Sequence, residues 1–121
     1  MPARKPDIQI KRAYDAPAPD DGTRVLIDRL WPRGLAKERA HLDEWLRDVA
    51  PSNELRQWYG HDPEKWDEFR RRYGAELKQG AAAQSLDHLR ELAAKGRLTL
   101  VFAARDADHA NARVLRDLLV G

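Results

Sequence analysis

The sequence contains no cysteine, and this absence excludes several kinds of chemistry. The protein has no disulfide bond, no thiolate nucleophile and no zinc or iron–sulfur site built from cysteine. Histidine and carboxylate residues do not follow a recognisable metal-binding spacing, so we expect no metal site. Also absent are the Walker-type glycine-rich loop, the GxGxxG dinucleotide fingerprint and the GxSxG nucleophile elbow. The commonest motif-defined enzyme classes therefore have no support, and no cofactor is expected.

A strong excess of one charge and a long hydrophobic run are missing too. The 22 basic and 20 acidic side chains give a formal net charge of +2, which by itself does not indicate nucleic-acid binding. No segment approaches the roughly 20 apolar residues that cross a bilayer. The N-terminal MPARKPDIQI lacks the apolar core of a secretory signal. We therefore expect a cytoplasmic protein that does not contact a membrane.

The residues that are present are typical of a globular chain. Its 121 residues have the length of one domain, which we assign to residues 1–121, with residues 1–7 expected to be flexible. Apolar residues make up 42% of the chain. This is enough for one core, since a domain of this size buries roughly two thirds of its unfolded surface.

Three segments have the composition of β-strands. The side chains of residues 8–14 alternate between two faces, as in a half-buried strand. Residues 25–31 form a second candidate strand. Residues 98–104, LTLVFAA, are apolar in character throughout, which is typical of a central strand covered on both faces.

Five segments follow helical periodicity, at about 37–49, 53–59, 63–78, 84–95 and 108–119. In the first of them, the apolar residues from Leu42 to Val49 fall at i, i+3, i+4 and i+7. Ser52 and Asp62 are expected to cap the second and third helices. Ser85 is the expected cap of the fourth helix, which stops at Gly96 in the usual left-handed conformation. Asp106 or Asp108 would cap the last.

The order of these segments favours a small α/β fold. Two strands, four helices, a strand and a helix predict a three-stranded, at least partly parallel sheet flanked by about five helices. The direction of the first strand stays open, because its connection of about ten residues is long for a hairpin and short for a helical crossover.

Charged residues gather where the predicted strands end. Asp28 and Arg29 lie late in the second strand, and Arg105 and Asp106 directly follow the third. In an open α/β sheet, ligands bind beyond the carboxyl ends of the strands. If the two strands are parallel neighbours, both pairs of residues face one site.

The helix expected after the second strand has no capping side chain between Pro32 and Lys37. Free N–H groups beside Arg33 and Lys37 would favour an anion, and Gly34 would let a ligand approach the backbone. Arginine suits a bidentate phosphate or carboxylate. The alternative is a structural turn in which Asp28 pairs with a neighbouring arginine.

Two histidines and one tryptophan complete the predicted site. His109 would lie in the first turn of the last helix and His61 in a tight loop, and both are acid–base candidates because histidine titrates at about 6.5. Trp31 can stack on a ligand ring or pack beneath the first helix. For proton transfer we select Asp28, Asp106 and His109.

The segment ELRQWYGHDPEKWDEFRRRY, residues 54–73, has the spacing of a helix–turn–helix DNA-binding motif. Its basic residues 70–72 are matched by acidic ones. Asp67 with Arg71 and Glu68 with Arg72 are favourable i,i+4 pairs. A solvated, salt-bridged helix face is therefore the preferred interpretation.

The same stretches resemble the YeaO-like family of small bacterial proteins, a domain of unknown function. The resemblance rests on IQIKRAYD, DGTRVLIDRLWPRGLAKE, LDEWL, APSNELRQWYGHDPEKWDEFRRRY and TLVFAARDADHANARVL. It covers most of the chain, and DRLWPRG is its most specific motif. It implies no particular activity, because the family has no established one. The matching positions are Arg12, Asp28, Arg29, Trp31, Pro32, Arg33, Gly34, Lys37, Trp45, Pro51, Leu55, Arg56 and His61.

One position departs from the family pattern. Relatives often carry asparagine directly after the histidine of the last motif, where this chain has Ala110 followed by Asn111. If that asparagine binds a ligand, the chemistry differs in this chain, whereas a merely capping asparagine would change little.

Taken together, the residues predict a pocket for a small anionic ligand at the strand carboxyl ends. The expected ligand residues are Arg29, Trp31, Arg33, Gly34, Lys37, Arg105 and His61, and the ligand would be a phosphate of a nucleotide or of a nucleic-acid end. The alternatives are a nucleic-acid-binding or regulatory module without chemistry and a protein-interaction domain. Whether the protein is an enzyme, and its oligomeric state, stay open.

Overall fold

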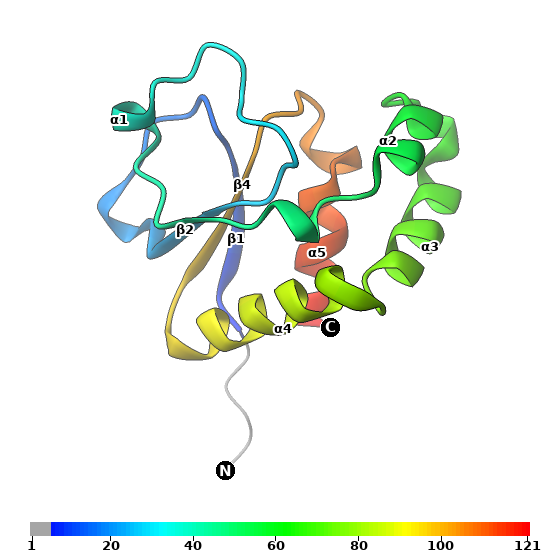
Figure 1. The fold of residues 1–121 in the computed structure, drawn as a ribbon. Coiled ribbons are helices and arrows are strands. Elements are labelled where there is room, and N and C mark those ends of the chain that lie inside the picture. The colour runs from blue at the N-terminus through cyan, green and yellow to red at the C-terminus, as the bar shows by residue number, and fades with distance from the viewer. Residues whose placement is uncertain (1–5) are drawn as a thin grey trace.

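A computed structural model describes residues 6–121, which form a four-stranded parallel sheet flanked by helices (Figure 1). The strands lie in the order β1-β4-β2-β3. They are β1 Ile8–Arg12, β2 Thr23–Leu26, β3 Glu44–Trp45 and β4 Leu98–Phe102. The helices are α1 Lys37–Ala40, α2 Asn53–Tyr59, α3 Trp66–Glu76, α4 Gly80–Lys95 and α5 Asn111–Val120. Short 3₁₀ turns are η1 Pro19–Asp21, η2 Arg47–Val49, η3 Pro63–Lys65 and η4 Ala107–His109.

The predicted parallel α/β architecture with five helices is confirmed, but the prediction of three strands is wrong. The three predicted strands form with shorter bounds, and the first runs parallel to β4. The fourth strand, β3, lies at the edge beside β2, inside the segment 37–49 that we expected to be helical.

Strand β4 lies at the centre of the sheet, between β1 and β2, as its sequence predicts. All five of its residues are buried. It pairs with β1 from Ile8↔Leu98 onward and with β2 from Thr23↔Leu98 onward. A strand covered on both faces must be apolar on both, which is why β4 carries no charge.

The two faces of the sheet are covered by different kinds of structure. Helices α3, α4 and α5 bury one face through a core that includes Phe69, Leu89 and Leu115. A smaller cluster on Leu26 and Val101 covers part of the other face and is built from the connection between β2 and β3. One face is thus closed by long helices, and the other by irregular chain and the single turn α1.

The expected helix at 37–49 fails because its apolar residues serve both faces of the sheet. Leu42 and Trp45 pack in the small cluster on Leu26, whereas Leu46 and Val49 pack in the main core. The helical spacing of these apolar residues therefore comes from a segment that crosses the edge of the sheet, and not from a helix.

Backbone contacts also stop the helix. Helix α1 ends at Ala40, because His41 adopts a left-handed conformation with φ 47°. The Arg24 guanidinium donates to the carbonyl groups of Ala40 and His41, at 2.9 and 3.1 Å. The next residues then bond to β2, with the Asp43 amide donating to the Arg24 carbonyl. These partners come from β2, so no local pattern reveals them.

The expected helix starts are partly confirmed. The Ser52 hydroxyl accepts from the Leu55 amide and the Asp62 carboxylate from the Glu64 amide, so both predicted caps form. The prediction for Ser85 is wrong, because α4 begins earlier and Ser85 lies inside it. Helix α4 stops before Gly96 as predicted, but that residue is extended, with φ 159° and ψ −167°, rather than left-handed.

The charged face of α3 is salt-bridged. This is the interpretation that the sequence favoured over a helix–turn–helix DNA-binding motif. Glu68 pairs with Arg72 as predicted, at 2.7 Å. Arg71 pairs with the same carboxylate at 2.6 Å instead of with Asp67.

Two expectations concern the ends and the surroundings of the chain. Of the segment 1–7, residues 1–5 lie outside the described residues, while Asp7 pairs with Arg97 at 2.9 Å. No helix within residues 6–121 is long and apolar enough to cross a membrane.

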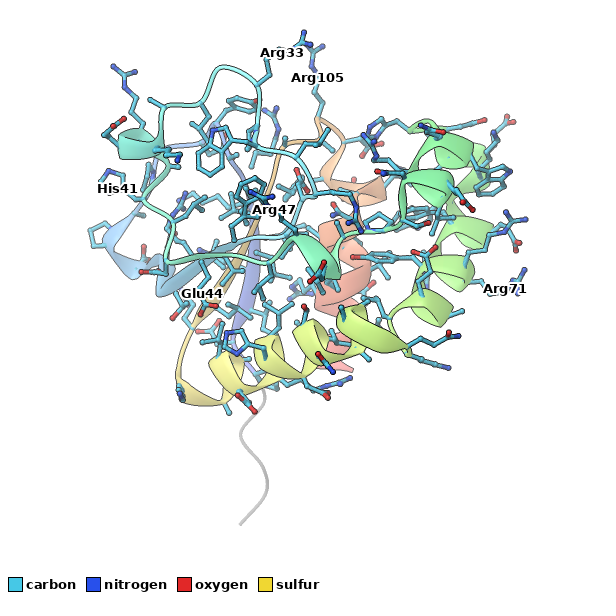
Figure 2. All side chains as sticks on the ribbon, in the orientation of Figure 1. Arg33, His41, Glu44, Arg47, Arg71 and Arg105 are labelled. Atoms are coloured by element: carbon cyan, nitrogen blue, oxygen red, sulfur yellow. The ribbon has the colours of Figure 1, made fainter. Side chains whose placement is uncertain are left out.

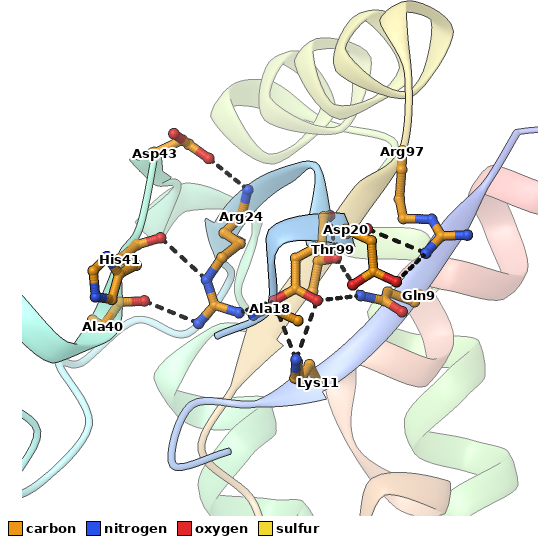
Figure 3. Close-up of polar contacts among 11 residues, drawn as sticks. Gln9, Lys11, Ala18, Asp20, Arg24, Ala40, His41, Asp43, Arg97 and Thr99 are labelled. Atoms are coloured by element: carbon orange, nitrogen blue, oxygen red, sulfur yellow. Dashed lines mark hydrogen bonds and ion pairs between the residues drawn. The ribbon is translucent and has the colours of Figure 1, made fainter. Parts of the chain in front are cut away.

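Beneath the connection from β1 to β2 lies a buried ionic cluster (Figure 3). The Asp21 carboxylate accepts from the guanidinium of Arg24 at 2.7 Å, the ammonium of Lys11 at 3.1 Å and the amide of Gln9 at 2.8 Å. Asp21 and Arg24 are only 2% and 4% exposed. The Thr99 hydroxyl, from β4, donates to the Asp21 carbonyl and ties the cluster to the sheet.

The ionic cluster predicts acid sensitivity. Burial raises the pKa of Asp21, but bonds from the Ala18 amide, Lys11 and Arg24 outweigh it and lower the pKa to about 2, from 3.8. The unfolded chain then binds the proton more readily, so this carboxylate stabilises the fold by about 2 kcal/mol above pH 4. We expect that contribution to be lost as the pH falls from about 4 to about 2. Urea midpoints across this range should fall less steeply for Asp21→Asn than for the parent, and equal slopes would contradict the assignment.

Candidate functional site

A cavity of about 620 Å³ opens at the carboxyl ends of β2 and β4. Its walls come from the segments after β1, β2 and β4, from the chain just before α2, from α2 and the turn after it, and from α3 and the start of α5. The chain leaving β2 covers one face of the sheet, and the chain leaving β4 enters α5 on the other. Because these two connections leave neighbouring parallel strands toward opposite faces of the sheet, a crevice remains between them. α/β sheets bind ligands in such crevices. The place predicted from the sequence, at the strand carboxyl ends, therefore contains a cavity.

The cavity has an acidic inner end, formed by Asp28 together with Asn111. The Asp28 carboxylate accepts from the Ala103 amide at 2.9 Å and from the Asn111 side-chain amide at 3.3 Å. Asn111 also donates to the Ile27 carbonyl at 3.2 Å. Burial raises the pKa of Asp28, although the bonds from Ala103 and Asn111 act to lower it. A carboxylate whose charge is poorly compensated beside a cavity is a frequent feature of functional sites.

The outer edge of the cavity, which we call the rim, is basic. It carries Arg33, Arg56, His61 and Arg105, all exposed. Figure 2 shows Arg33 and Arg105 extending from two separate loops at the same end of the molecule. The backbone below Arg33 is held by the Tyr14 hydroxyl, which donates to its carbonyl at 2.9 Å. His61 has φ 56°, a conformation uncommon outside glycine that often marks functional positions.

Asp106 and His109 form an oriented pair on one wall. Nδ1 of His109 lies 2.7 Å from the Asp106 carboxylate, so its Nε2 is left for other partners. The hydrogen bond from His109 lowers the pKa of Asp106. The His109 ring packs edge-on against Trp66, and its carbonyl accepts from the Tyr59 hydroxyl at 2.7 Å. Burial raises the pKa of Tyr59 to about 12, so its hydroxyl stays a donor.

Arg29 and Trp31 line the cavity but are also bonded to the surrounding chain. Arg29 donates to the carbonyl groups of Ala50 and Pro51, at 3.2 and 3.4 Å. The Trp31 indole N–H donates to the Leu35 carbonyl at 2.7 Å. Both side chains therefore shape the loop after β2, and the T-shaped contact of Trp31 with Trp45 anchors it on the sheet.

Gly34 and Lys37 do not line the cavity, although we expected both to bind ligand. Helix α1 lacks a side-chain cap, as predicted, since Ala36 occupies the N-cap. It has only four residues, however, too few for a substantial helix dipole. Helix α1 therefore does not support anion binding, and the support that remains comes from the arginines.

Several cavity residues were not proposed from the sequence. Asn111 lies one position beyond the family asparagine and reaches the inner end from the first turn of α5. Arg56 was named only through the family resemblance, and neither Phe69 nor Tyr59 was predicted to line a site. Only the packing of α2, α3 and α5 against the strand ends brings these residues to the cavity.

Comparison with known proteins adds the family. A family model described as the inactive DUF488-N3 subclade matches residues 7–121. An uncharacterized protein of Mycobacterium tuberculosis is 45% identical over 118 residues, which is 98% of this chain and 98% of its own. The uncharacterized protein YeaO of Escherichia coli is 42% identical over 113 residues, 93% of this chain and 96% of its own. No solved structure is a significant match. By these matches the chain belongs to the YeaO-like family, in the subclade described as inactive DUF488-N3.

Proposed function

We propose that the cavity binds a small anionic ligand through its arginines and does so without turning the ligand over. One observation carries the proposal. Arg29, Arg33, Arg56 and Arg105 line one cavity, and within residues 6–121 none of the four forms a salt bridge. Elsewhere in residues 6–121, six of the eleven other arginines do, among them Arg24, Arg72 and Arg97. Guanidinium groups without a carboxylate partner around an apolar concavity suit a phosphate or a carboxylate.

Binding without turnover is favoured by the lining itself. The side chains facing the cavity include no serine, threonine, cysteine or lysine among the described residues. A covalent mechanism would have to use a carboxylate, a histidine or a tyrosine. The description of the matching subclade as inactive agrees with this composition. The pair formed by Asp106 and His109 supports the cavity wall and supplies a hydrogen-bonding nitrogen to the ligand.

Removal of two of the rim arginines, Arg33 and Arg105, tests the proposal. We expect phosphate, sulfate and nucleotides to raise the melting temperature of the parent, since a ligand at a hundred times its Kd adds about 2.7 kcal/mol. The Arg33→Ala/Arg105→Ala protein should bind at least tenfold more weakly, because each hydrogen bond to a charged group contributes about 1.5–3 kcal/mol. The Lys37→Ala/Arg39→Ala protein loses the same charge outside the cavity and should bind like the parent.

Either of two results would contradict anion binding in the cavity. One is the absence of any shift with every anion. The other is an equal loss in both double variants, which would indicate general charge attraction rather than a site.

A second candidate is supported by the mouth of the cavity. Leu30 and Tyr14 are 63% and 46% exposed, unusually so for large apolar side chains, and both line the cavity. Exposed rings and apolar groups beside arginines suit a single nucleic-acid strand. This candidate predicts binding of oligonucleotides that falls steeply with salt, and no preference for mononucleotides.

A further inference from the structure

The polar groups of the cavity are sorted by kind along its depth. At the inner end, the Asn111 amide donates both to Ile27 and to Asp28. The hydroxyl of Tyr59 is likewise used, on the His109 carbonyl. What the inner end still offers is acceptors: the remaining lone pairs of the Asp28 carboxylate, which accepts two bonds of about four possible, and the side-chain oxygen of Asn111.

The rim offers the opposite chemistry. Arg33 and Arg105 are exposed and positively charged, and a guanidinium group has donors only. Asp106 follows Arg105 in the chain, but its carboxylate is already paired with His109. The rim therefore requires an acceptor, and a charged one gains most.

Between the two ends the wall is apolar. It includes Phe69, Tyr59 and Ala103, and the first two are only 2% and 4% exposed. The Phe69 and Tyr59 rings stack at 4.2 Å, which makes this wall rigid. A rigid apolar wall suits an apolar ring better than a flexible polar chain.

These three requirements belong to one molecule. An inorganic anion is too small to reach both the rim and the inner end of a cavity of about 620 Å³, a size typical of small organic ligands. A neutral nucleoside has no charge for the rim. Resting on the proposed function, we infer that the cavity binds a nucleoside monophosphate with an amino-bearing base, the amino group held by Asp28 and Asn111 and the phosphate held by Arg33 and Arg105. The phosphate belongs either to a free nucleotide or to the end of a nucleic-acid strand.

Matched nucleotide pairs test the inner end on the unaltered protein. GMP and IMP differ by one amino group, and CMP carries an amino group where UMP carries an oxygen. Isothermal titration calorimetry should show each amino-bearing nucleotide binding at least tenfold more tightly than its partner, because a hydrogen bond to a carboxylate is lost in the other. Asp28→Asn should remove this preference.

The outcomes separate this inference from the proposed function. Equal binding within both pairs, or a preference that survives in Asp28→Asn, would overturn the nucleotide assignment. If phosphate binding still depended on Arg33 and Arg105 in that case, the anion site would stand. Failure of every nucleotide and of inorganic phosphate to bind would overturn both.

A 5′-phosphorylated trinucleotide distinguishes the two sources of the ligand. Tighter binding than that of the mononucleotide with the same first base would identify a strand end, and weaker binding would identify a free nucleotide. Both results support an amino-bearing nucleotide with its phosphate at the rim.

Discussion

We expect Asp21→Ala to lower the free energy of unfolding by about 3–5 kcal/mol, which is the cost of breaking a buried ion pair by removing one partner. The substitution leaves Arg24, which is 4% exposed, without its carboxylate at 2.7 Å. Lys11, Gln9 and the Ala18 amide lose the same acceptor. Denaturant midpoints at pH 7 measure the change.

The expected loss is large because, among residues 6–121, Asp21 is the only carboxylate with which the Arg24 guanidinium forms a salt bridge. Arg24 also donates to the carbonyl groups that end α1, so its displacement would disturb the chain leading to β3. Asp20→Ala is the matched control, since Asp20 is 81% exposed and lies 3.8 Å from Arg97. A surface pair of this kind contributes about 0–1 kcal/mol. A loss below about 1 kcal/mol for Asp21→Ala would show that the pair is solvated and that the fold does not depend on it.

Gly22→Ala is expected to destabilise the protein by about 2–6 kcal/mol, from two separate costs. Gly22 has φ 68°, and a residue with a side chain in such a conformation is strained by about 1–3 kcal/mol. A Cβ at this position would also lie 2.2 Å from the backbone oxygen of Arg97. That oxygen accepts from the Thr23 amide, so it cannot move without loosening the start of β2. Overpacking adds a further 1–3 kcal/mol or so.

Gly34→Ala separates the two costs. Gly34 has a similar φ of 76°, but nothing lies within 4 Å of a Cβ placed there. Thermal and denaturant unfolding should therefore show a loss for Gly34→Ala limited to the backbone strain, about 1–3 kcal/mol. Equal losses for the two variants would mean that the contact with Arg97 is relieved by a small shift and that Gly22 is required for its conformation alone.

Much of the fold was predictable from the sequence because its signals are local. The Ser52 and Asp62 caps depend on a side chain and an amide two or three residues away. The apolar run at 98–102 predicts a central strand whatever the arrangement of the other segments. Asp28 and Arg105, which lie two and three residues beyond the ends of β2 and β4, line the cavity for the same local reason.

The identity of β3 and the composition of the cavity needed the tertiary structure. The spacing of Leu42, Trp45 and Val49 is helical, yet these residues pack on opposite faces of the sheet. Periodicity reports which residues are apolar, and does not report which surface buries them. Asn111 and Asp28 are 83 residues apart in the chain, so no local rule connects them.

The sequence alone was therefore enough to predict the α/β class, the central strand, the helix starts capped by Ser52 and Asp62, and the end of the sheet at which charge collects. The tertiary structure decided the fourth strand, the burial of Asp21 with Arg24, and the exclusion of Lys37 from a cavity that Asn111 and Arg56 enter. The physical reason is that caps and strand composition depend on neighbours along the chain. Buried ion pairs, strand edges and cavity walls depend on hydrogen bonds and packing between segments that only the folded chain brings together.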